Sequence, residues 1–225
     1  MSTKRKSEQL PLHLPLEVAS AREDLIVTTA NQQAVTFLDN WPEPELSPIA
    51  ILAGPVGAGK THLAHIWAAR MEAKFLPLST ASDLAVPQGG SYVVEDLVQG
   101  AFSETWLFHL INTVRSNNSA LLLTSRRWPG DWGIALPDLQ SRIKLAHLME
   151  LNEPDDALLA GVLMKLFSDR QLHVEAPVID YLVQRMERSL ASAQNLVFEI
   201  DGLSLAEKRG VTKQLAGDAL RNLGA

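Results

Sequence analysis

The chain has 225 residues, of which 46% are apolar, and it carries a formal net charge of −6. This length and apolar content suffice for one medium domain, or for a domain with a small appendage, built around a hydrophobic core. The lack of cysteine excludes a disulfide framework and a thiolate metal site, and the acidic balance argues against a broad electrostatic grip on nucleic acid. Because no apolar stretch reaches the roughly 18 residues of a membrane-spanning helix, we expect a cytoplasmic protein with no membrane partner.

The first 20 residues predict an extended tail. Pro11 and Pro15 interrupt this segment, and apolar side chains occupy its even positions from 10 to 16. Proline donates no hydrogen bond to a strand ladder, so a central strand is excluded here. An extended segment of this kind is suited to the groove of another protein.

Short apolar runs alternate with helical patterns over residues 21–152. Helical spacing is found at 31–41, and the first strand is expected at 49–53, directly before a glycine-rich loop and another helical pattern. Four more apolar runs have the length of buried strands: 74–78, 91–94, 119–124 and 146–151. Helices are expected between them at 102–115 and in the segment PDLQSRIK. Buried strands that alternate with helices are typical of an α/β protein with a parallel sheet.

After Glu153 and Pro154 the pattern becomes helical only. Helices are expected at 155–170, 177–187, 189–206 and 212–223. We therefore expect three parts: the tail at 1–20, an α/β domain at 21–152 and a small all-helical domain at 153–225.

The segment from Gly54 to Thr61, GPVGAGKT, satisfies the phosphate-loop pattern G-x-x-x-x-G-K-[ST]. In this pattern the glycines let backbone N–H groups converge on phosphate oxygens, the lysine reaches the β- and γ-phosphates, and the hydroxyl holds Mg²⁺. We therefore predict ADP or ATP, with Mg²⁺, as the ligand. The residues expected to contact it from this segment are Gly54, Pro55, Gly57, Ala58, Gly59, Lys60, Thr61 and His62.

Two further predicted strands end in polar residues that suit a phosphate site. Glu95 and Asp96 follow an apolar run; Glu95 is expected on the metal side together with Thr61, and Asp96 on the side of the attacking water. A solvated carboxylate pair is the alternative, but the neighbouring phosphate loop favours the functional interpretation. Thr124 and Ser125 end another strand, where a hydroxyl can orient water near the γ-phosphate.

Arg142 lies on the short helix predicted for PDLQSRIK. An arginine in this position can close a phosphate site on a neighbouring molecule, and its alternative is an ordinary surface salt bridge. His62 and His65 are three residues apart but have no evident third ligand, so roles in packing or at the surface are favoured over a metal site.

The order of these motifs, together with the separate helical part, resembles the AAA+ ATPases and in particular the DnaA-type bacterial replication initiators. The resemblance covers most of the chain and implies a P-loop AAA+ parallel sheet flanked by helices, followed by an all-helical lid. It assigns DLIVTTANQQAVTFL to the segment beside the adenine, GPVGAGKT to Walker A, VVED to Walker B, LLLTSR to sensor 1 and DLQSRI to the arginine-finger box. The residues that it implies for catalysis are Glu95, Asp96, Ser125 and Arg142, with Thr124 or Ser125 as sensor 1.

The chain departs from this family at several positions. Ala191 stands where the lid usually carries the sensor 2 arginine, Arg188 is one turn away, and Glu95 replaces the usual aspartate. These departures predict weak or no intrinsic ATP hydrolysis. The stretch between the strands at 74–78 and 91–94 is shorter than the helical region with which initiators touch DNA, and no helix-turn-helix domain follows the lid. Direct sequence-specific DNA binding is therefore not expected.

The tail adds a second resemblance. Gln9, Leu10, Leu12 and Leu14 form a segment that is similar to the Q-L-x-L-x-L peptide by which proteins dock on the bacterial sliding clamp; the alternative is a leucine-bearing leader. Together the two resemblances imply a negative regulator of replication initiation. It would bind the clamp and, through Arg142 supplied in trans, stimulate ATP hydrolysis by DnaA to give inactive ADP-DnaA.

Other assemblies and functions remain open at this stage. A homodimer is one further assembly that the resemblance allows. A loader or adaptor that uses ATP as a switch for another replication protein would share every nucleotide motif. A P-loop small-molecule kinase is a weaker alternative, because the helical part has no dense arginine cluster to cover the phosphates.

Overall fold

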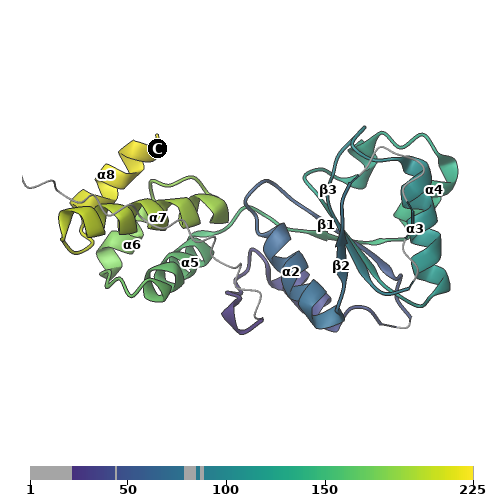
Figure 1. Ribbon diagram of the computed structural model, residues 1–225, viewed down its shortest axis with the longest axis horizontal. Helices are drawn as coiled ribbons and strands as arrows, with labels where there is room; N and C mark the ends of the chain where they lie inside the picture. Colours follow the sequence, from purple (N-terminus) through teal and green to yellow (C-terminus); the bar gives the residue numbers. More distant parts are fainter. Residues whose placement is uncertain (1–21, 44, 79–84, 87–88, 225) are drawn as a thin grey trace, which may run out of the picture.

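The structure of the chain is a computed structural model that describes residues 22–43, 45–78, 85–86 and 89–224. The predicted tail at 1–20 lies outside the described residues, and so do all four residues of the predicted clamp peptide. Two parts are evident, a sheet with helices on both faces and a group of helices that follows it in the chain (Figure 1).

Five parallel strands form the sheet. Their order in space is β2 (Lys74–Leu76), β3 (Tyr92–Leu97), β4 (Leu121–Ser125), β1 (Ile49–Ala53) and β5 (His147–Glu150). All five residues of β1 and of β4 are buried, as expected for central strands covered on both faces. Because the strands are parallel, the ends of β1, β3 and β4 meet at one edge of the sheet, directly beside the loop that follows β1.

Alternate side chains of the strands belong to two separate cores. Ile49 and Ile51 of β1 pack with α3 (Glu104–Ser116) and α4 (Pro137–Lys144), whereas Ala50 and Leu52 pack with α1 (Gln32–Asn40) and α2 (Lys60–Met71). This alternation follows from the two-residue period of a strand. It puts α2 on one face of the sheet and α4 on the other (Figure 1).

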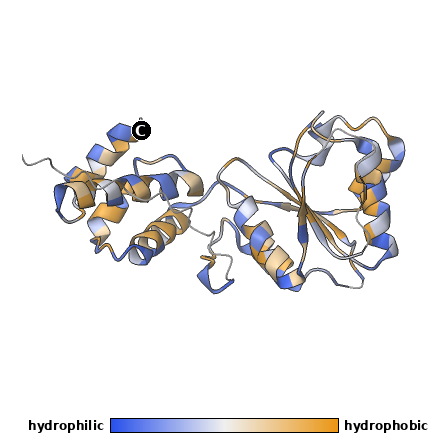
Figure 2. Cartoon of the chain, viewed as in Figure 1, coloured by the Kyte–Doolittle hydropathy of each residue, from blue (hydrophilic) through white to orange (hydrophobic). Residues whose placement is uncertain are grey.

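The helices of the second part are α5 (Asp156–Asp169), α6 (Ala176–Val183), α7 (Leu190–Glu207) and α8 (Lys213–Leu223). They have a core of their own, and in Figure 2 the apolar residues of these helices gather where the helices face one another. Side chains of Asp155, Ser189 and Thr212 cap the starts of α5, α7 and α8 by accepting hydrogen bonds from backbone N–H groups. Such caps explain where the chain starts each helix.

The N-terminal segment connects the two parts. The Thr29 hydroxyl donates to Asp155 Oδ2 at 3.0 Å, and Lys165 of α5 pairs with Asp24 at 3.0 Å. A Cβ on Gly161 of α5 would lie 3.1 Å from the side chain of Ile26, so these two segments are in close contact there. The hydrogen bond, the ion pair and the packing of the half-buried Ile26 hold the helical part against the start of the α/β part.

The expected fold class is confirmed, with a parallel sheet between helices and a helical part after it. The predicted elements agree with the observed ones to within a few residues; the strand predicted at 91–94, with two carboxylates expected at its end, continues to Leu97. Two short 3-10 turns, Arg22–Asp24 and Pro129–Trp132, are not predicted. Within the described part of the chain, no helix is long and apolar enough to cross a membrane.

Candidate nucleotide-binding site

The loop between β1 and α2 has the geometry of a phosphate cradle. Gly57 and Gly59 have φ angles of +78° and +98°, which only glycine adopts without strain. A Cβ on Gly54 would lie 2.3 Å from the carbonyl oxygen of Leu151, so close packing requires glycine at this position too. Gly59 caps α2, so the free backbone N–H groups and positive end of that helix face the loop.

Lys60 is held inside this loop. Its side chain is buried, and Nζ donates hydrogen bonds to the carbonyl oxygens of Gly54 at 2.8 Å and Pro55 at 2.7 Å. Burial lowers the pKa of the Lys60 ammonium, an effect that Arg126 reinforces and that Asp96 and Glu95 oppose. The charges of both predicted carboxylates and of Arg126 therefore act on the loop lysine.

Glu95 offers an oxygen for a metal ion. Its Oε1 is buried and has no hydrogen-bond partner among the described residues, a costly arrangement unless a cation or donor completes it. Thr61, at the start of α2, is exposed. Mg²⁺ at phosphate sites is commonly held by one or two protein groups together with phosphate oxygens and water. The donor set therefore fits the predicted Mg²⁺, for which Thr61 and Glu95 are the candidate ligands.

Asp96 occupies an irregular position in β3. Its φ is +53°, and the pairing of β3 with β4 shifts register between Val94 and Leu97. The Asp96 N–H donates to Thr124 Oγ1 at 3.0 Å, and Arg126 contacts the Asp96 carboxylate at 3.2 Å. The irregularity turns this side chain away from the strand pattern and brings it beside the end of β4.

The two hydroxyls at the end of β4 differ in what they bind. Ser125 is fully buried, donates to the carbonyl oxygen of Leu97 at 2.8 Å, and accepts from Arg127 N and from Trp132 Nε1 at 3.1 and 3.0 Å. These three partners use the hydrogen-bonding capacity of a hydroxyl. The Ser125 hydroxyl therefore holds the β4–α4 connection in place, and its predicted catalytic role stays a prediction. Thr124 accepts from Asp96 and keeps its own proton to donate, so it remains the candidate for sensor 1.

Helix α7 begins against the phosphate loop. The Leu190 N–H donates to the carbonyl oxygen of Gly57 at 3.0 Å, and a Cβ on Gly57 would lie 2.2 Å from Ser189 Oγ. Arg188 points instead to the start of α5, where it pairs with Asp156 at 2.6 Å and donates to the carbonyl oxygen of Pro154 at 2.8 Å. The lid thus contacts the loop through a backbone N–H and a serine, while Arg188 is engaged elsewhere.

His62 lies in the first turn of α2 and is half-buried. Burial lowers the pKa of its imidazole, with a further lowering by His65 and Lys165 and an opposing effect of Asp24. These neighbours belong to α2, α5 and the N-terminal segment. His65 stacks on Phe75 with the ring centres 4.4 Å apart, as expected for packing, and the contact of His62 with nucleotide stays a prediction.

Arg142 is remote in topology from the phosphate loop. It lies on α4, on the face of the sheet opposite to α2, and the buried Leu139 and Ile143 fix that helix in the core. The Arg142 side chain is half-buried, and its guanidinium has no hydrogen bond or ion pair within the described chain. Glu104 accepts hydrogen bonds from the N–H groups of Ala135 and Leu136 and so fastens the loop before α4.

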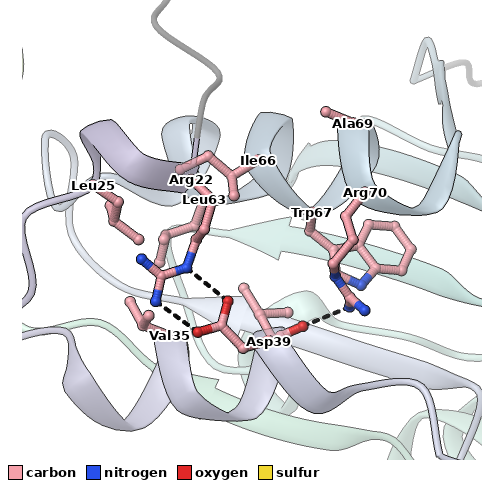
Figure 3. Close-up of a pocket in the computed structure, with 10 residues that line it drawn as sticks. Arg22, Leu25, Val35, Asp39, Leu63, Ile66, Trp67, Ala69 and Arg70 are labelled. Carbon is pink, nitrogen blue, oxygen red and sulfur yellow. Dashed lines mark hydrogen bonds and ion pairs between the residues drawn. The ribbon is translucent and has the colours of Figure 1, made fainter.

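A separate cavity of about 220 Å³ lies between the N-terminal segment, α1 and α2 (Figure 3). Its charged side chains have partners. Arg22 forms two hydrogen bonds with Asp39, which lower the pKa of that carboxyl, and Arg70 donates to the carbonyl oxygens of Leu38 and Trp41. Among the described residues that line this cavity, each charged side chain therefore has a hydrogen-bond partner within the chain.

The chain has relatives among curated proteins, although no family model matches it. It is 24% identical to an uncharacterised protein of Haemophilus influenzae over 180 residues, which cover 73% of this chain and 78% of that protein. It is 23% identical to the chromosomal replication initiator protein DnaA of Flavobacterium psychrophilum over 196 residues, which cover 76% of this chain and 41% of the initiator. The similarity thus spans less than half of that DnaA.

Solved structures with the same fold include domain III of the replication initiation protein DnaA from Thermotoga maritima. It has a TM-score of 0.75 and 17% identity, covering 93% of this chain and 98% of that one. AMPPCP-bound DnaA from Aquifex aeolicus has a TM-score of 0.64 and 19% identity, covering 83% and 68%. A RuvB variant from Thermotoga maritima has a TM-score of 0.67 and 17% identity, covering 86% and 68%. The chain therefore has the AAA+ P-loop fold found in domain III of DnaA and in RuvB.

Proposed function

We propose that this chain is a DnaA-related AAA+ regulator of replication initiation, similar to Hda, that binds ADP or ATP with Mg²⁺ and stimulates ATP hydrolysis by DnaA. The similarity to DnaA supports a replication-related AAA+ protein. The phosphate cradle, Lys60 and the unpartnered Glu95 oxygen support nucleotide and Mg²⁺ binding. That a DnaA of the same fold has been solved with AMPPCP is further support.

The observation that carries the proposal is the state of Arg142. A cation that serves its own chain's nucleotide should lie near that chain's loop, whereas Arg142 lies on the opposite face and has no partner among the described residues. Supplied to the γ-phosphate held by DnaA, its guanidinium neutralises the charge that develops as the phosphoryl group leaves. Glu104, which holds the loop before α4, is a positioning residue for this arginine.

The lid supports a regulatory rather than an enzymatic role for the chain's own nucleotide. Ala191 cannot contact a phosphate through its side chain, and Arg188 is paired with Asp156. We therefore expect the bound nucleotide to hold the loop and lid together, through Leu190 and Gly57, with weak or no hydrolysis. The reaction that matters takes place at the DnaA site.

Docking on the sliding clamp is the second component of the proposal. It rests on Gln9, Leu10, Leu12 and Leu14, which lie outside the described residues. Binding to a clamp that is loaded on DNA would raise the local concentration of the module where replication proceeds.

A reconstituted assay tests this proposal. DnaA is loaded with radiolabelled ATP, and phosphate release is followed with and without this protein, in the presence of clamp loaded on DNA. We expect release to accelerate with the intact chain, and to return to the intrinsic DnaA rate when the four tail residues are changed to alanine. If the intact chain leaves DnaA turnover unchanged while it binds both nucleotide and clamp, the function is that of an AAA+ switch for another protein.

A further inference from the structure

Arg126 is a charged residue of the phosphate-loop edge that the proposed function does not use. It directly follows β4, and the carbonyl oxygen of the preceding Ser125 accepts a hydrogen bond from Gly54 N at 3.1 Å. The end of β4 is thereby fastened to the first residue of the phosphate loop. The Arg126 side chain thus starts one residue away from a direct contact with the loop.

Asp96 orients the guanidinium of Arg126. Nε lies 3.4 Å from Oδ1 and Nη2 lies 3.2 Å from Oδ2, an arrangement with two parallel contacts. Asp96 is itself fixed, since its N–H donates to Thr124. The Nη1 group of Arg126 has no hydrogen bond within the described residues, so one edge of the guanidinium is left to bind an anion.

The positive charges of the site favour the binding of an anion. Arg126 adds to the lowering of the Lys60 pKa, for which burial is the main cause, so its positive charge acts on the loop lysine. Two cations beside a helix N-terminus attract a phosphate. Within the lid, meanwhile, Arg188 is engaged by Asp156 and Pro154. Arg126, at the end of β4, is therefore a second cation that acts on the loop beside Lys60.

We propose that Arg126 binds the terminal phosphate of a nucleoside triphosphate and makes this chain distinguish ATP from ADP. The free Nη1 edge donates to γ-phosphate oxygens while the other edge stays on Asp96. Recognition of the third phosphate then depends on Arg126 at the end of β4. The lid cannot supply this contact from Ala191, because alanine has no charged side chain. This inference rests on the proposed nucleotide site.

Titration of the full chain with fluorescent ATP and fluorescent ADP, each with Mg²⁺, tests this role. A charge-assisted hydrogen bond to phosphate corresponds to about tenfold or more in affinity. We expect R126A to lose about tenfold in affinity for the ATP probe and less than about twofold for the ADP probe. R126K keeps the positive charge but loses the planar guanidinium with its paired donors. Its affinity for the ATP probe should therefore lie between those of the wild type and R126A.

Arg127 provides the matched control. It is the next residue in the chain, it is exposed, and its side chain has no partner among the described residues. R127A should leave both affinities unchanged. The exposed pair of Arg126 with Asp96 contributes little to folding, so R126A should keep the thermal midpoint of the wild type.

The outcomes separate this inference from the proposed function. If the wild type binds both probes and R126A leaves their affinity ratio unchanged, or weakens both equally, Arg126 does not read the third phosphate and only the inference fails. If the wild type binds neither probe, the nucleotide site fails, and the role of Arg126 fails with it.

Discussion

Lys60 and Arg126, at the phosphate-loop edge, have partners within the chain, whereas the guanidinium of Arg142 on α4 has none among the described residues. Lys60 is hydrogen-bonded to two loop carbonyls, and Arg126 is paired with Asp96. Both regions are built on the same sheet, but on different elements and faces. A group that is oriented by its own chain is prepared to bind a ligand of that chain, and a group that is fixed only by its helix is available to another molecule.

Removal of the loop lysine is the strongest test of the difference between Lys60 and Arg142. K60A eliminates a buried cation whose two hydrogen bonds would be exchanged for contacts with phosphate, so we expect nucleotide affinity to fall by about a hundredfold or more. R142A should leave the same affinity unchanged. Isothermal titration with ATP and Mg²⁺ measures both variants, and an equal loss in both would show that Arg142 acts on the chain's own nucleotide.

A second variant concerns the contact of the lid with the loop. G57A introduces a Cβ that would lie 2.2 Å from Ser189 Oγ, at a φ of +78° that costs a non-glycine residue about 1–2 kcal/mol. We expect the melting temperature to fall and nucleotide affinity to decrease about tenfold, because the lid is displaced from the loop. G130A is the control, since a Cβ on Gly130 meets nothing within 4 Å. Unchanged affinity in G57A would separate the lid contact from nucleotide binding.

The two hydroxyls at the end of β4 offer a smaller and sharper comparison. S125A leaves the buried carbonyl of Leu97 without its donor, so we expect a loss of about 1–3 kcal/mol in unfolding free energy and little change in the affinity of the folded protein for nucleotide. T124V removes the candidate sensor and should affect the response to ATP more than stability. Urea denaturation and nucleotide titration of both variants check this division; the reverse pattern would restore Ser125 as the functional hydroxyl.

Asp155, at the junction of the two parts, gives the smallest expected effect. It caps α5 and accepts from the Thr29 hydroxyl; burial opposes ionisation, but these hydrogen bonds prevail and lower the pKa of its carboxyl. Because the folded pKa lies below the unfolded one, the stabilisation is present above the unfolded value and is lost as the pH falls through the folded value. D155A should cost about 1 kcal/mol at neutral pH.

D155N tests the pH dependence without removal of the cap, since asparagine also caps helices. Its stability at neutral pH should stay near that of the wild type. The loss on acidification should be smaller than in the wild type, when both are compared by urea denaturation at a series of pH values between neutral and acid. An identical acid loss in both proteins would exclude a contribution from Asp155.

Most of the fold follows from the sequence because burial leaves a periodic signature. The five apolar runs are the five strands, and the glycine loop lies where GPVGAGKT predicts it. A run of apolar residues cannot reveal that β3 continues past the two carboxylates to Leu97, because this extension depends on pairing with β4 and on a shift of register. The spatial order of the strands likewise depends on contacts between distant segments.

The sequence predicts which residue types gather at the candidate site, whereas their hydrogen-bond partners depend on the fold. Thr124 and Ser125 are neighbours with similar hydroxyls, but Thr124 accepts a hydrogen bond from Asp96, whereas Ser125 binds Leu97 and Trp132. Arg126 follows these hydroxyls in the sequence, but its pairing with Asp96 depends on the irregular φ of that residue. The only sequence signal for Arg126 was its position as a basic residue directly after the strand that ends in Thr124 and Ser125.

The central claim is that Arg142 acts on a nucleotide held by DnaA, and the most direct measurement is the rate of phosphate release from ATP-bound DnaA in the presence of clamp on DNA. R142A is compared with wild type and with K144A, which removes a neighbouring exposed cation of α4. An arginine finger supplied in trans accelerates hydrolysis about a thousandfold or more, so R142A should abolish stimulation while it binds nucleotide and clamp normally, and K144A should stimulate fully. Full stimulation of DnaA by R142A would contradict the account.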